Sequence, residues 1–121
     1  MNTQGKQRTT KKKVDLHNVV MPLLEAMYTE FKKLSKKKPE GALSKNKIQV
    51  VNRLLEKCRE VLESEASLQF LDVIDEDSVP QNSDVVLMLS QYAVAMEQFK
   101  NTYHRLVGSG FDSKWVWHTS D

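Results

Sequence analysis

The chain has 121 residues, of which 40% are hydrophobic and 28% are charged, so it has room for one domain with a single core. No apolar run approaches the roughly 20 residues needed to cross a bilayer, and no apolar segment follows the basic N-terminus as it would in a secretory signal. Cys58 is the single cysteine, which excludes an intrachain disulfide. We therefore expect an intracellular, cytoplasmic protein, with the nucleus left open.

Charge is divided unevenly along the chain. Residues 1–47 contain 12 Lys/Arg and 4 Asp/Glu, a net charge of +8, whereas residues 48–121 contain 6 and 12, a net charge of −6. This division indicates an anionic partner at one end or association between opposite ends, unless the charges are simply scattered over the surface.

Residues 1–13 are polar and basic, with no apolar residue after Met1. Nothing in this stretch can offset the entropy lost on ordering, so we expect a disordered arm. The arm would either contact phosphates or remain a solvated tail.

A first helix is predicted over residues 15–37, beginning after either Asp15 or Asn18. Pro22 would bend the helix if it starts at Asp15, and would cost less if it starts at Asn18. Pro39 and Gly41 end it. Its predicted apolar stripe is formed by Leu16, Val20, Leu23, Met27, Phe31 and Leu34.

A second helix is predicted over residues 45–63, with Ser44 as its N-cap. Apolar side chains recur at alternating spacings of three and four along it, namely Ile48, Val51, Leu55, Cys58 and Leu62. The stretch over 67–74 is predicted as a short helix, because its apolar residues do not alternate as in a strand.

The strongest helical pattern spans residues 84–107, with Ser83 or Asp84 as the cap and Gly108 at the end. Its stripe is formed by Val85, Leu89, Tyr92, Met96, Phe99, Tyr103 and Leu106. The sequence therefore predicts an all-α fold, a small bundle of three main helices and one short helix over residues 14–108, with Leu55 and Phe99 buried.

The C-terminal tail, residues 109–121, contains both tryptophans of the chain. We expect residues 111–117 to be a docking segment, with Phe111, Trp115 and Trp117 as the partner-binding side chains. In an extended conformation Trp115 and Trp117 point the same way. The alternative is that both rings fold back onto the bundle.

No motif in the chain predicts catalysis, a metal or a cofactor. His17, His104 and His118 are far apart in sequence, and the acidic run over 72–77 lacks the spacing of a calcium loop. Cys58 falls on the predicted buried face of its helix, where cysteine usually behaves as a small hydrophobe. We therefore expect neither an enzyme nor a binder of small-molecule substrates, and no membrane protein.

Lysines dominate the basic half and are expected to converge near one end of the bundle, where they could contact phosphates. These candidates are Lys11, Lys12, Lys13, Lys32, Lys33, Lys36, Lys37 and Lys38. Our leading hypothesis is a non-catalytic protein–protein interaction module, either an adaptor or a small subunit of a complex, with self-association left open. The alternative is a lysine-rich protein that binds nucleic acid without sequence preference.

Overall fold

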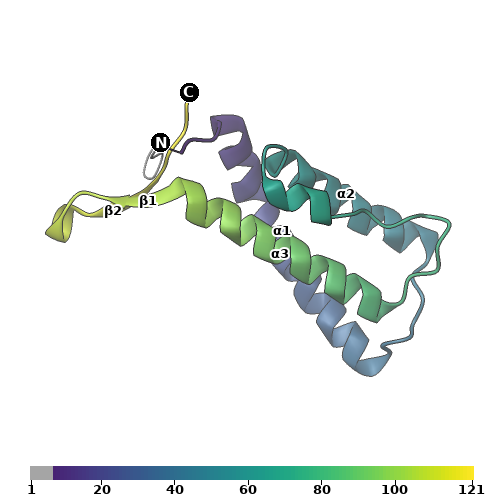
Figure 1. Cartoon of the computed structure of the whole chain (residues 1–121). Coiled ribbons are helices and arrows are strands. Elements are labelled where there is room, and N and C mark those ends of the chain that lie inside the picture. The colour runs from purple at the N-terminus through teal and green to yellow at the C-terminus, as the bar shows by residue number, and fades with distance from the viewer. Residues whose placement is uncertain (1–6) are drawn as a thin grey trace.

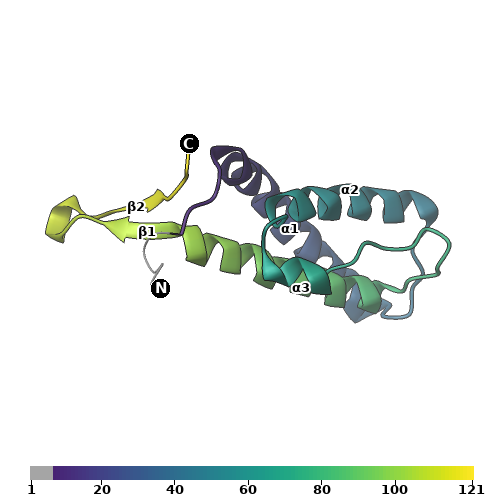
Figure 2. The same cartoon turned by 45° about the horizontal axis from the view of Figure 1, so that its top comes forward.

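Three α-helices form the body of the protein in this computed structural model, which describes residues 7–121. The helices are α1 (Lys11–Lys37), α2 (Lys45–Val61) and α3 (Asn82–Tyr103). In the views of Figures 1 and 2, α1 crosses behind α3. It packs against both other helices, whereas α2 and α3 contact each other much less. Within the described chain, no helix is both long enough and apolar enough to cross a membrane.

The core lies where the three helices meet. Leu55 and Phe99 are buried as predicted, with 0% and 1% of their surface exposed. The α3 stripe is also confirmed within the helix, because its members from Val85 to Phe99 are all buried. At about 1.5–3 kcal/mol for each large apolar side chain, this stripe supplies much of the free energy that holds the bundle together.

The start of α1 differs from the prediction. Thr10 is the N-cap, and its hydroxyl accepts a hydrogen bond from the backbone N–H of Lys13 at 3.2 Å. The helix therefore begins neither at Asp15 nor at Asn18, and Pro22 lies well inside it. Pro22 and Asn18 are both exposed, so water can reach the Asn18 carbonyl, which receives no N–H from Pro22.

The predicted disordered arm over 1–13 is wrong for residues 11–13, which form the first turn of α1. Thr9, just before that turn, is buried and hydrogen-bonded to the backbone of the C-terminal segment. The remainder of the prediction, for residues 1–6, lies outside the described residues.

Ser44 caps α2 as predicted, because its hydroxyl accepts a hydrogen bond from the Lys47 N–H at 3.2 Å.

Residues 62–81 connect α2 to α3 largely without helix. The short helix expected over 67–74 is instead a 3₁₀ turn, η1 (Ala66–Phe70), followed by extended chain. The side-chain amide of Asn52 holds that chain by hydrogen bonds to both the N–H and the C=O of Ile74, at 2.8 and 2.7 Å, so these two backbone groups are not available for a helix.

The all-α prediction is wrong at the end of α3. The helix stops at Tyr103, and β1 (His104–Val107) pairs antiparallel with β2 (Lys114–Trp117). Gly108 turns the hairpin with φ at +89°, and a Cβ there would come within 2.7 Å of the Asp112 carbonyl oxygen, so the turn requires glycine. Gly108 is thus a hairpin residue and not the expected helix end, and Leu106, beyond α3, is exposed.

Candidate docking surfaces

Trp117 packs against its own bundle. Its ring centroid lies 5.3 Å from that of His17 and 6.0 Å from that of Phe99. Trp115 lies on the same face of β2, and both indole rings contact His104, at 5.4 and 4.9 Å. The prediction that the two rings point the same way is therefore confirmed, and Trp117 joins the edge of the core in the same chain.

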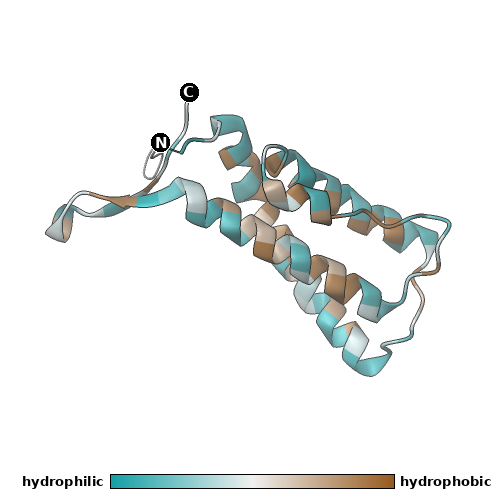
Figure 3. Cartoon of the chain, viewed as in Figure 1, coloured by the Kyte–Doolittle hydropathy of each residue, from teal (hydrophilic) through white to brown (hydrophobic). Residues whose placement is uncertain are grey.

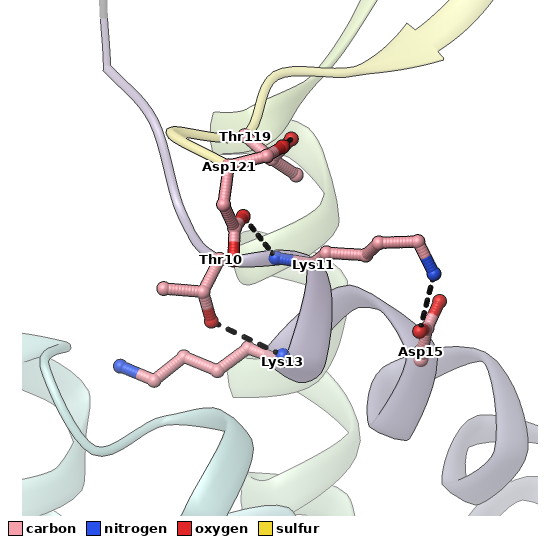
Figure 4. Close-up of polar contacts among 6 residues, drawn as sticks. All are labelled: Thr10, Lys11, Lys13, Asp15, Thr119 and Asp121. Atoms are coloured by element: carbon pink, nitrogen blue, oxygen red, sulfur yellow. Dashed lines mark hydrogen bonds and ion pairs between the residues drawn. The ribbon is translucent and has the colours of Figure 1, made fainter.

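The chain beyond β2 is fastened to the start of α1. Thr9 and Thr119 form a parallel β-bridge, in which the Thr9 N–H donates to the His118 carbonyl at 3.0 Å. The Asp121 carboxylate accepts from the backbone N–H of Lys11 at 2.8 Å (Figure 4). A carboxylate at this position satisfies a free N–H and favours the positive end of the α1 dipole.

The tip of the hairpin projects beyond α3, away from the bundle (Figures 1 and 2). Phe111 is fully exposed there, and 61% of the surface of Trp115 is exposed. The three predicted partner-binding residues therefore differ in their exposure to solvent. Phe111 and Trp115 face solvent, whereas Trp117 is half-buried.

His17 is a buried polar side chain that contacts the aromatic rings of Phe99 and Trp117. Its imidazole is only 2% exposed and stacks on Phe99 at 5.5 Å. Nε2 donates to the Met96 carbonyl at 3.0 Å, and Nδ1 is buried without a partner among the described residues. Burial lowers the pKa of His17 below its usual value of 6.5, while the bond to Met96 partly opposes this. Protonation would bury a charge with an unpaired N–H.

A groove of about 670 Å³ runs between α1 and α2, and it was not predicted from the sequence. We call it the α1–α2 groove. Its walls are almost entirely apolar, and Val19, Leu23 and Val50 in it are 64%, 56% and 46% exposed. Its other apolar lining residues are Leu16, Val20, Ala26, Met27, Phe31 and Leu54.

The groove exists because α1 has apolar residues on two faces. One face is buried and consists of Val14, His17, Val20, Leu24 and Phe31. The other follows the spacing 3, 4, 3, 4 through Leu16, Val19, Leu23, Ala26 and Glu30, all of which line the groove. The predicted α1 stripe mixed these faces, so that Val20 and Phe31 are buried but Leu23 and Leu34 are exposed. The excess of apolar positions over one stripe was the sequence signal for the groove.

At the rim of the groove, the negative charge lies on α1 and the positive charges lie on α2. Glu30 lies on the α1 side, and Arg53 and Lys57 lie on the α2 side. Lys57 is bonded to Glu60 at 3.0 Å on the same helix. Within residues 7–121, neither Glu30 nor Arg53 takes part in an ion pair.

The predicted phosphate-contacting lysines do not converge on one place. Lys11, Lys12 and Lys13 begin α1, and Lys32 to Lys37 lie in its last two turns. Lys13 and Lys32 are 19 residues apart in one helix, which at about 1.5 Å for each residue separates the two groups by about 30 Å. The C-terminal end of α1, largely teal in Figure 3, and the start of α2 both lie at the end of the bundle opposite the hairpin (Figure 1), so Lys45 and Lys47 belong to the same end as the second group.

Reactive groups are sparse among the described residues. The Cys58 thiol is fully buried as predicted, and burial raises its pKa to about 12, so it stays protonated at neutral pH. No set of three or more His, Cys, Asp or Glu side chains between residues 7 and 121 is placed to hold a metal ion.

Comparison with models of known protein families, with curated proteins and with solved structures finds no match to this chain. The surfaces described above are therefore the basis for any functional proposal.

Replacing Trp117 by Ala is expected to lower the free energy of unfolding by about 2 kcal/mol, because a large, half-buried ring leaves the edge of the core. The loss should be the same at every protein concentration in a urea melt, since the contacts are within one chain. The control, Phe111→Ala, should change stability by less than about 0.5 kcal/mol. A Trp117→Ala protein of unchanged stability and lower molar mass would show that the ring docks on another subunit instead.

Stability should also depend on His17 in mildly acidic solution. The pKa of His17 is lower in the folded than in the unfolded chain, so its neutral form contributes fully above about pH 6.5. As the pH falls below that value the unfolded chain takes up the proton first, and stability decreases toward the folded-state pKa. Urea melts from pH 7.5 to 5 should show this slope, and His17→Gln should flatten it. An equal slope in both proteins would contradict the assignment to His17.

Proposed function

We propose that the chain is a non-catalytic protein–protein interaction module, an adaptor or small subunit, that binds a partner through the α1–α2 groove. One observation carries the proposal, namely an apolar groove in which Val19, Leu23 and Val50 are about half exposed. Soluble proteins seldom expose large contiguous apolar patches unless something covers them.

The shape of the groove favours a helical occupant. Two helices form its walls, and its α1 side chains recur at the spacing by which helices interdigitate. An amphipathic helix can place its own apolar face along such a surface. The exposed side chains Phe111 and Trp115 on the hairpin offer a second, smaller contact.

A photo-reactive benzoyl-phenylalanine at position 23 tests this proposal in cells that produce the protein naturally. Irradiation should give a discrete heavier adduct, because Leu23 lies in the groove and is accessible. The matched control is the same residue at position 87, since Leu87 is 62% exposed on α3 and does not line the groove. Adducts from both positions alike, or from neither, would contradict a binding role of the groove.

A second candidate function, binding of nucleic acid without sequence preference, is favoured by the basic end of the bundle. The exposed lysines that gather there from α1, α2 and the loop between them are Lys32, Lys33, Lys36, Lys37, Lys38, Lys45 and Lys47. Lysine ammonium groups contact phosphates but read bases poorly, so such binding would be strongly dependent on salt.

Changing Lys32, Lys33, Lys36 and Lys37 together to Gln should leave the helical content unchanged, because all four side chains are exposed. If this end binds nucleic acid, the salt slope of binding should become shallower by about 3, as fewer counterions are released. Lys11→Gln/Lys12→Gln, at the far end of α1, is the control. Wild-type protein that retains neither DNA nor RNA at low salt would remove this candidate.

A further inference from the structure

We propose that the occupant of the α1–α2 groove is a second copy of this chain, placed so that α1 of each copy lies on α2 of the other. This inference rests on the proposed function and names the partner of that site. The two-fold axis would run roughly parallel to the helices, and the four helices would form an antiparallel arrangement around a shared apolar centre.

The apolar part of the groove suits such an assembly. Leu16, Val19, Leu23 and Ala26 form a heptad-spaced seam along α1, opposite Val50 and Leu54 on α2. The small Ala26 side chain leaves room for a close helix approach at the end of the seam nearest Glu30. In a two-fold contact each copy contributes the same patch, so the seam of one copy covers the exposed Val50 of the other.

The rim charges select this arrangement over other dimers. Glu30 belongs to α1, and Arg53 and Lys57 belong to α2. When α1 lies on α2 of the second copy, Glu30 faces Arg53 of that copy, and the same pair forms twice. In an alternative dimer, the two α1 helices would pack antiparallel with Leu23 at the centre of the contact. Glu30, seven residues after Leu23, would then lie opposite Leu16 of the other copy, seven residues before Leu23. The Glu30 charge would face an apolar side chain.

The C-terminal segment of the chain does not compete for the groove. Trp117 packs on His17 and Phe99, and Asp121 is bonded to the first turn of α1. These contacts fasten the segment at the edge of the core and at the start of α1. The groove therefore remains open along the middle of α1 and α2 in the single chain.

Sedimentation equilibrium of the purified full chain measures the dimer directly. The wild type should be a dimer whose dissociation constant rises on the order of 100-fold in Leu23→Glu, because a carboxylate enters the apolar seam. Leu87→Glu, equally exposed on α3, should leave the constant unchanged. Circular dichroism verifies that both variants fold. A wild type that stays monomeric up to about 1 mM overturns the proposal, as does equal weakening by the two variants.

Complementary charge reversals test the geometry. Glu30→Lys and Arg53→Glu should each weaken self-association by roughly tenfold, since two attractions become repulsions. Mixed in equal amounts, the two variants should form the heterodimer preferentially. Only in the heterodimer do positions 30 and 53 carry opposite charges at both of the symmetric contacts. Native mass spectrometry distinguishes the three dimers by mass. A statistical mixture would overturn the proposed stacking of α1 on α2.

Failure of this inference can be separated from failure of the proposed function. A monomeric purified protein whose position-23 adduct in cells contains a different protein overturns the second copy as occupant and leaves the interaction module standing. An absence of adducts, together with a monomer, removes both.

Discussion

The bundle depends on the burial of one apolar face of α1, but α1 has more apolar surface than its two neighbours cover. Its inner face, with Leu24 completely buried, is packed between α2 and α3. Its outer face, centred on Leu23, is walled on one side by α2 and is open on the other. One apolar face on α1 is enough to pack the helix into a three-helix bundle. The second apolar face therefore leaves apolar side chains that the single chain does not bury.

The aromatic cluster has the opposite character, because it is satisfied within the chain. His17, Phe99, Tyr103 and Trp117 contact one another at the junction of α1, α3 and the hairpin. The Tyr103 hydroxyl donates to Glu65 at 2.9 Å and thereby includes the connector after α2. A two-stranded hairpin alone is marginal in water, and this cluster is what ties it to the bundle. The aromatic cluster therefore ties the hairpin to the bundle, whereas Val19, Leu23 and Val50 in the groove remain about half exposed in the single chain.

The elements whose pattern is local were predictable from the sequence. The α3 stripe and the Ser44 cap follow from spacing and capping chemistry over a few residues. The errors arose where distant segments decide. Residues 104–107 become a strand because 114–117 lie beside them, and the first turn of α1 forms where Asp121 accepts from Lys11. The groove could be inferred only in part, because the sequence shows that α1 has excess apolar positions but not which neighbours leave them uncovered.

The fastening of Thr9 and Lys11 to residues 118–121 has a consequence for the order of events during synthesis. The partners Lys11 and Asp121 are 110 residues apart in the chain, so at translation rates of 5–20 residues per second the first turn of α1 waits roughly 5–20 s for its distant partner. Trp117, which covers His17, is made only shortly before. Until these residues are made, the first turn of α1 and the surface of His17 that Trp117 covers lack their partners, although α2 and α3 have already been synthesised and can cover the rest of the inner face of α1.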